Sequence, residues 1–211
     1  GITPRAPYSL KDVALDTVGV LDALGVAQAH IVGASMGGMI AQRVALAAPG
    51  RTLSLISIMS TSGAKGLPNP KAKVIRALMA RPKGQDREAI LKHYVHLLRG
   101  SGSPAFPMEE SLVRERISAG LDRSYAPFGT MRQMVAIAAD TGRARALANI
   151  SAPTLVLHGK ADPLVPYACG EDTARRIAGA RMVGIDGMGH DLPPEVITRL
   201  LPPMLGHLQS T

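Results

Sequence analysis

Three side chains of this sequence could together perform nucleophilic catalysis: Ser35, Asp162 and His190. Ser35 is the middle residue of the run GASMG at positions 33–37, which directly follows the apolar run HIV at positions 30–32. A glycine at each end lets the backbone turn sharply without a side-chain clash, so the spacing predicts a serine exposed between a buried strand and a helix. The alternative is a glycine-rich turn whose serine is only structural.

A serine hydroxyl attacks a carbonyl carbon only when a base takes its proton, and that base needs a third group to hold its tautomer. Asp162 follows an apolar run at positions 154–157, and His190 follows the next predicted strand at positions 181–185. Loops at the carboxyl ends of parallel strands share one rim of the sheet, so we expect Ser35, Asp162 and His190 to converge. The chain order Ser, Asp, His is typical of this geometry.

Other interpretations of these loops stay open. Asp162 precedes a proline and could simply begin a turn, and His190 could be an ordinary exposed loop histidine. Asp191 is an alternative carboxylate, although its place beside the histidine favours a helix-flanking role. His93 and His96 have a spacing that metals accept on one helix face, but no third ligand accompanies them, so no metal site is expected.

The elements that must position these residues alternate between helix and strand near both ends of the chain. Strands are expected at residues 30–32, 53–59, 154–157 and 181–185. Helices are expected at residues 10–24, 36–48 and 167–178, and from residue 194 onward. Pro202 and Pro203 should kink or interrupt the last helix. This order is typical of an α/β fold, in which helices cover a mostly parallel sheet.

The middle of the chain breaks this alternation, because its apolar pattern is helical throughout. Helices are expected at residues 71–80, 86–98, 109–119 and 130–138, with a short turn at 143–148. Loops rich in glycine, serine and proline separate them. We therefore expect residues 1–60 and 150–211 to form the core, and residues 61–149 to form a helical cap on it.

The composition is that of a globular protein and excludes several classes of function. Of the 211 residues 46% are hydrophobic and 19% charged, and no stretch approaches a membrane-spanning length, so no stable membrane insertion is expected. The single cysteine, Cys169, excludes an internal disulfide and a cysteine-based metal cluster. This cysteine usage fits a reducing compartment, so a cytoplasmic location is expected.

The net charge of +8 lies entirely in the middle of the chain, because residues 61–150 hold 15 lysines and arginines against 7 aspartates and glutamates. Only 3% of the residues are aromatic and none is tryptophan, so the stacking residues of a nucleic-acid-binding protein are lacking. We expect no nucleic-acid partner. We expect a solvated basic cap instead, which is either a plain charged surface or one that draws in anionic substrates or touches anionic lipid.

Four segments resemble the α/β-hydrolase superfamily: residues 10–24, 29–38 (AHIVGASMGG), 153–162 (PTLVLHGKAD) and 187–190 (GMGH). The similarity points to the esterase branch that contains aclacinomycin methylesterase-like enzymes and cofactor-free haloperoxidase-like perhydrolases. It implies an α/β-hydrolase fold and a serine esterase that needs no cofactor. It also implies that Ser35 is the nucleophile, His190 the base and acid, and Asp162 the group that orients the histidine. The backbone N–H of Met36 would supply half of the oxyanion hole.

The resemblance leaves three functions open. The first is hydrolysis of a small-molecule carboxylic ester through an acyl-enzyme on Ser35, with an apolar pocket built partly from Met79, Met131 and Met134; core packing is the alternative for each methionine. The second keeps the same three residues and uses peroxide as acceptor, as in perhydrolases. The third is a non-catalytic, truncated relative of the fold.

The start of the chain departs from the family pattern. Members of the family begin with several strands ahead of the helix that we expect at Leu10, and one of their loops provides the second oxyanion N–H. No segment before Tyr8 can form these strands, so we expect the strand that ends at Gly33 to be an edge of the sheet. Because an apolar edge strand invites pairing, we expect a homodimer or a companion segment that supplies the strands.

Overall fold

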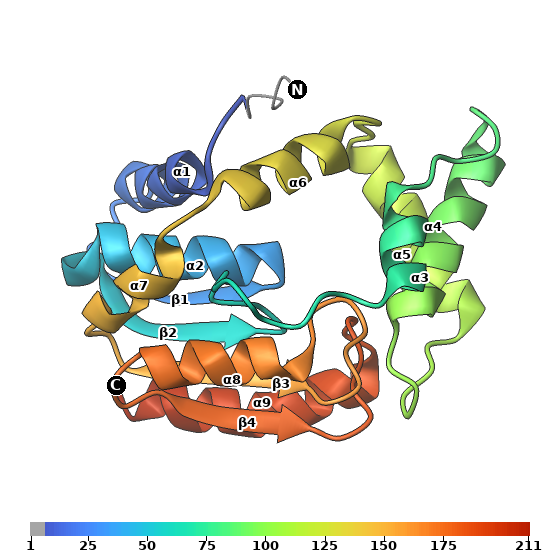
Figure 1. Ribbon diagram of the computed structural model, residues 1–211. Coiled ribbons are helices and arrows are strands. Elements are labelled where there is room, and N and C mark those ends of the chain that lie inside the picture. The colour runs from blue at the N-terminus through green and yellow to red at the C-terminus, as the bar shows by residue number, and fades with distance from the viewer. Residues whose placement is uncertain (1–6) are drawn as a thin grey trace.

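The structure, a computed structural model, describes residues 7–211 and contains one sheet of four parallel strands (Figure 1). The strands lie in the order β1 (Ala29–Ala34), β2 (Thr52–Ile58), β3 (Thr154–Gly159) and β4 (Arg181–Ile185). Every neighbouring pair is parallel. Parallel neighbours need a long crossover between them, which here is helical each time, so the predicted α/β class is confirmed.

Helices flank the sheet as the alternating pattern predicts. They are α1 (Leu10–Ala23), α2 (Met36–Ala47), α8 (Tyr167–Arg176) and α9 (Pro194–Gln209), with a 3₁₀ turn at Pro49–Arg51 before β2. The first helix begins at a capping box, in which the Asp12 N–H donates to Ser9 Oγ at 3.2 Å and the Ser9 N–H donates to Asp12 Oδ2 at 2.7 Å.

The sequence analysis expects Pro202 and Pro203 to kink or interrupt the last helix, and the interruption is wrong, since α9 continues through both residues. Each proline lacks an N–H and so removes one bond from the helical ladder. The apolar side of α9 nevertheless packs against the sheet through the buried side chains of Val196 and Leu200. Tertiary packing of this face offsets the two missing bonds, because helical stability in proteins comes mainly from such packing.

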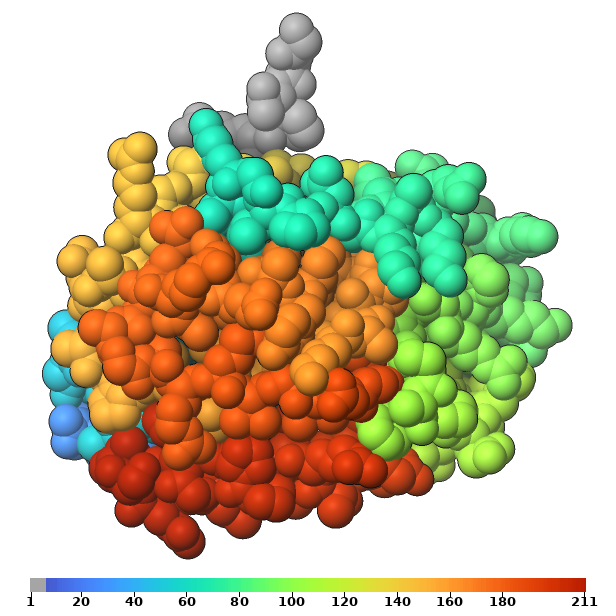
Figure 2. All heavy atoms as spheres, turned by 60° about the horizontal axis from the view of Figure 1, so that its bottom comes forward, coloured from blue at the N-terminus to red at the C-terminus, as the bar shows by residue number. Residues whose placement is uncertain are grey.

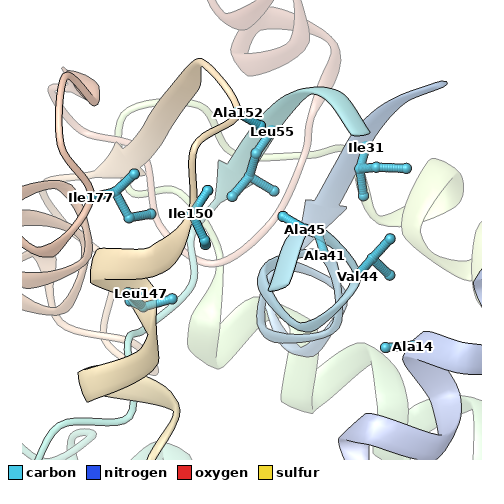
Figure 3. Close-up of a cluster of buried hydrophobic side chains, with 10 residues drawn as sticks. All are labelled: Ala14, Ile31, Ala41, Val44, Ala45, Leu55, Leu147, Ile150, Ala152 and Ile177. Carbon is cyan, nitrogen blue, oxygen red and sulfur yellow. The ribbon is translucent and has the colours of Figure 1, made fainter. Parts of the chain in front are cut away.

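The core has one layer on each face of the sheet, because successive side chains of a strand point to opposite faces. Leu55 packs with Ala41 and Val44 of α2 in a cluster that α1 and the segment before β3 complete (Figure 3). Its neighbour Ile56 packs in the second cluster, together with Leu200 of α9. These two layers fix the sheet between its helices.

The strand β1 is an edge of the sheet, as predicted, since among residues 7–211 it pairs with β2 alone. Val32 of this strand is 47% exposed, which is unusual for a valine in a parallel sheet. The expectation that no strand precedes Tyr8 concerns mainly residues 1–6, which lie outside the described residues.

The middle of the chain is helical, as predicted, and follows β2. It comprises α3 (Ala72–Met79), α4 (Arg87–Ser101), α5 (Glu110–Arg123), α6 (Gly129–Ala139), α7 (Arg143–Ala146) and a 3₁₀ turn at Leu147–Asn149. Figure 1 shows α3, α4 and α5 together at one end of the sheet, while α6 runs back toward α1 and α2. No helix within residues 7–211 is both long and apolar enough to cross a membrane.

A buried ionic network ties both ends of this helical segment to α2. The Arg143 side chain is only 2% exposed and donates to Asp140 Oδ2 and to the carbonyl oxygen of Thr61, each at 2.6 Å. Arg143 also donates to Gln42 Oε1, and Arg43 Nε donates to Asp140 Oδ1 at 2.9 Å. Thr61 opens the segment and Asp140 lies near its end, so the network joins the two places where the segment meets the core.

Candidate active site

Ser35 stands at the turn between β1 and α2, where the sequence analysis expects a sharp bend. Its backbone has φ 54° and ψ −122°, a left-handed φ that costs a non-glycine residue free energy and persists only when neighbours enforce it. Two hydrogen bonds do so: the Ser35 N–H donates to Ile58 O at 2.9 Å, and Ser60 Oγ donates to Ser35 O at 2.7 Å. The backbone N–H and carbonyl of Ser35 are therefore held by the end of β2 and by the segment just after it.

The glycines of the turn differ in how much space a side chain would have at each position. A Cβ atom at Gly33 would lie 2.0 Å from the carbonyl oxygen of Gly37, and one at Gly38 would lie 2.6 Å from Ser60 Cβ. A Cβ atom at Gly37 would meet nothing within 4 Å. The expectation that both terminal glycines of the GASMG run avoid a clash is thus right for Gly33 and wrong for Gly37, whose missing side chain points into open space.

We expect Gly33→Ala to lower the ester hydrolysis that the family resemblance implies by about 10²-fold and to lower the thermal unfolding midpoint, because the start of α2 must move away from the new methyl group. The matched control is Gly37→Ala, which keeps the turn and adds a residue with a better helix propensity by about 0.5–1 kcal/mol. Hydrolysis rates and thermal melts of the two variants decide this prediction. Equal losses in both variants would contradict it.

The structure brings together the three side chains that the sequence analysis expects to converge. His190 Nε2 lies 2.8 Å from Ser35 Oγ, and His190 Nδ1 lies 2.7 Å from Asp162 Oδ2. The Asp162 carboxylate accepts, so His190 Nδ1 carries a proton and donates it to Asp162. His190 Nε2 is then free to accept the proton of the Ser35 hydroxyl. The three groups lie in the order hydroxyl, imidazole, carboxylate.

Asp162 also begins a turn, as the alternative interpretation of its sequence position expects. Its second carboxylate oxygen, Oδ1, accepts from the N–H groups of Leu164 and Val165, each at 2.8 Å. The side chain is fully buried. These two bonds orient the carboxylate, so that its Oδ2 atom faces His190.

His158 also supports this turn, a role that the sequence analysis did not anticipate. Its fully buried ring donates from Nε2 to Val165 O at 2.8 Å, and its Nδ1 atom has no partner among residues 7–211. Burial lowers the pKa of His158, which favours the neutral ring. The signal available in the sequence was its place at the end of a buried strand, four residues before Asp162.

Asp191 takes no part in the chain of bonds from Ser35 to Asp162. Its carboxylate accepts from the Ser103 N–H at 2.9 Å and from the Ser103 hydroxyl. Burial raises the pKa of Asp191. It lies ahead of α9, as a helix-flanking residue would, but its partner is the connection between α4 and α5.

The remaining predicted site group is the backbone N–H of Met36, the first residue of α2. The first N–H groups of a helix have no partner within the helix, and they favour negative charge. Two residues further along the helix, the Gly38 N–H donates to Ser35 O at 3.0 Å. Met36 therefore presents an N–H next to Ser35, at the end of the helix that suits a developing oxyanion.

Two neighbouring grooves lie in the helical segment. One of about 600 Å³ is lined by Met79 and Met131 among other apolar side chains, and these methionines are 46% and 49% exposed. The other, of about 850 Å³, has more lysines and arginines than aspartates and glutamates in its lining, and shares Arg81 and His93 with the first. Core packing, the alternative for these two methionines, is therefore wrong.

The alpha/beta hydrolase family matches residues 1–196 of the chain. Rhodomycin D methylesterase DauP of Streptomyces sp. (strain C5) is 31% identical over 97% of this chain and 74% of its own length. Poly(3-hydroxyalkanoate) depolymerase of Ectopseudomonas oleovorans is 32% identical over 89% of this chain and 63% of its own. A solved hydrolase from Pseudomonas aeruginosa PA01 superposes with a TM-score of 0.69 at 28% identity, over 98% of this chain and 73% of its own.

Proposed function

Because this chain belongs to the alpha/beta hydrolase family, we propose that it cleaves carboxylic esters through an acyl-enzyme on Ser35. The observation that carries the proposal is the bonded order of Ser35, His190 and Asp162, with separations of 2.8 and 2.7 Å. A hydroxyl, an imidazole and a carboxylate in this order form the catalytic triad of serine hydrolases. The similarity to a methylesterase supports esters as the substrate class.

The reaction proceeds in two halves. Ser35 Oγ attacks the ester carbonyl carbon while His190 Nε2 takes the hydroxyl proton, and Asp162 stabilises the imidazolium that forms. The Met36 N–H donates to the oxyanion of the tetrahedral intermediate. As the intermediate collapses, His190 returns the proton to the leaving alcohol. In the second half, His190 deprotonates a water molecule that attacks the acyl-enzyme, which releases the acid and regenerates Ser35.

Residues 61–149 act in this proposal as the cap over the reaction site. The groove that Met79 and Met131 line would hold an apolar part of the ester, since flexible thioether side chains adapt to ligands of varied shape. The basic groove beside it would favour esters that also carry a negative charge. Comparing hydrolysis of neutral and carboxylate-bearing esters of equal chain length tests this preference.

A fluorophosphonate probe and a p-nitrophenyl ester test the proposed reaction on the intact chain. The probe should label the folded protein on a single peptide that contains Ser35, and the ester should release p-nitrophenol in a burst as the acyl-enzyme accumulates. Folded protein that the probe does not label would instead support the non-catalytic alternative.

The exposed strand β1 is proposed to pair with a second copy of the chain or with a companion segment that supplies further strands. Its unpaired edge and its exposed Val32 support this proposal. Companion strands would also bring the second oxyanion N–H that the family resemblance implies. Loss of one such donor costs about 3 kcal/mol of transition-state stabilisation, so the unpaired chain is expected to be a weak enzyme.

Light scattering on the 211-residue chain tests the pairing, with the homodimer as the expected result. Val32→Lys should shift the dimer toward monomer, because a charge on an edge strand opposes further pairing. Val20→Lys is the control, since Val20 is also exposed but lies on α1. A stable monomer of the unaltered chain would contradict the homodimer.

A further inference from the structure

The loop that carries His190 is bound by the connection between α4 and α5. We call residues 101–105 together with residues 187–191 the histidine clamp. Within it, the His190 N–H donates to Ser101 O at 2.7 Å, and the Gly189 N–H donates to Ser103 Oγ at 2.9 Å. Two consecutive backbone groups at the histidine are therefore held by the helical segment and not by the sheet.

Ser103 is the centre of the histidine clamp. Its hydroxyl accepts from the Gly189 N–H and donates to Asp191 Oδ1, and its own N–H donates to the same carboxylate oxygen at 2.9 Å. The residue is only 4% exposed, so water competes little for these bonds. A buried hydroxyl that both donates and accepts, with a carboxylate as one partner, makes a strong and directional contact.

Close backbone packing leaves the clamp little room to move. A Cβ atom at Gly189 would lie 2.2 Å from Gly102 O, so the two chains touch through their backbones. On the other side of the loop, the Ala161 N–H donates to Met188 O at 3.0 Å. The histidine loop is thus held between the helical segment and the loop of Asp162. Figure 2 shows the yellow-green part of the helical segment directly against the red C-terminal part of the chain.

We infer that Ser103 and Asp191 are positioning residues, through which the helical segment holds His190 in line with Ser35 and Asp162. The inference rests on the proposed function, because it assigns the clamp a purpose in the proposed triad. The helical segment would then do more than cover the substrate, since its docking sets the backbone of the general base. A displacement of about 1 Å at such a group can cost about 10²-fold in rate.

Ser103→Ala tests the inference, with Ser101→Ala as its matched control. Both serines are 4% exposed and lie two residues apart. The clamp uses only the backbone carbonyl of Ser101, which alanine keeps, whereas the Ser101 hydroxyl donates to Leu97 O at 3.1 Å within its own helix. Loss of this hydroxyl therefore leaves the bonds of the clamp intact. Ser103→Thr retains the hydroxyl, so its amide exchange, its His190 resonance and its kcat should match those of the unaltered protein. Should Ser103→Ala fail to fold, Ser103→Cys keeps the size while its thiol is only a weak hydrogen-bonding group.

Two measurements by NMR report on the clamp whether or not the protein turns over an ester. In Ser103→Ala the amide protons of Gly189 and His190 should exchange about tenfold faster than in Ser101→Ala, because the hydroxyl's bonds to Gly189 and Asp191 are both lost and the loop opens locally. The Nδ1 proton of His190, which bonds to Asp162, should lose its sharp downfield resonance. Identical exchange rates and an identical resonance in the two variants would overturn the inference.

Steady-state kinetics test whether the histidine clamp affects the rate of catalysis. Ser103→Ala should lower kcat by roughly 10–10²-fold with KM unchanged, whereas Ser101→Ala and Ser103→Thr should stay near the unaltered rate. A kcat equal to that of Ser101→Ala in an active enzyme would overturn the positioning role. If the unaltered protein itself hydrolyses no ester, the proposed function fails, while amide exchange and the imidazole resonance still decide whether Ser103 orders His190.

Discussion

Ser35→Ala is expected to abolish ester hydrolysis, with a loss on the order of 10⁴-fold or more in kcat. Without the hydroxyl no acyl-enzyme can form, and the remaining groups can only bind and polarise the ester. The fold should be retained, because the backbone bonds from Ser35 to Ile58 and Ser60 do not use the side chain. Alanine tolerates the left-handed φ of 54° at this position no better and no worse than serine.

Rates of p-nitrophenyl ester hydrolysis and labelling by a fluorophosphonate measure this loss. The control is Ser54→Ala, which removes another buried hydroxyl from the neighbouring strand β2. Ser54 bonds to His30 at 2.8 Å, at the opposite end of the strands from the serine turn, so its loss should leave the rate unchanged. Equal rates for Ser35→Ala and the unaltered protein would end the proposed mechanism.

Asp162→Asn is expected to lower kcat by about 10⁴-fold while the turn that it begins survives. The amide oxygen can still accept from the N–H groups of Leu164 and Val165, as Oδ1 does now. The amide nitrogen then faces His190 Nδ1 and donates to it, so that His190 Nε2 carries the proton. An imidazole with its proton on Nε2 cannot take the proton of Ser35.

The kinetics of Asp162→Asn and Asp191→Asn together identify the carboxylate that orients the histidine. Asp191→Asn alters the histidine clamp and should cost far less than Asp162→Asn, because the bond between His190 and Asp162 remains. Thermal melts of both variants show whether the loss of rate reflects unfolding. A larger loss in Asp191→Asn than in Asp162→Asn would reassign the orienting role to Asp191.

Much of the architecture could be predicted from local patterns. Apolar residues at helical spacing place α1 correctly to within a residue, and Ser9 with Asp12 marks its start. The run GASMG predicts the serine turn, because only a few residue types allow such a bend. The order of Ser35, Asp162 and His190 along parallel strands is enough to bring them to one rim, since the carboxyl ends of parallel strands meet there.

Contacts between distant segments were decided by the tertiary structure alone. The bonds of Ser103 to Gly189 and Asp191 join parts of the chain with no shared periodicity or motif. The exposure of Met79 and the open space at Gly37 depend in the same way on what other segments leave uncovered. The sequence by itself determined the elements and the chemistry of the three convergent side chains, because short-range sterics, periodicity and strand direction control them. Which neighbours hold those side chains in place follows from packing between segments, and this appears only when the chain is folded.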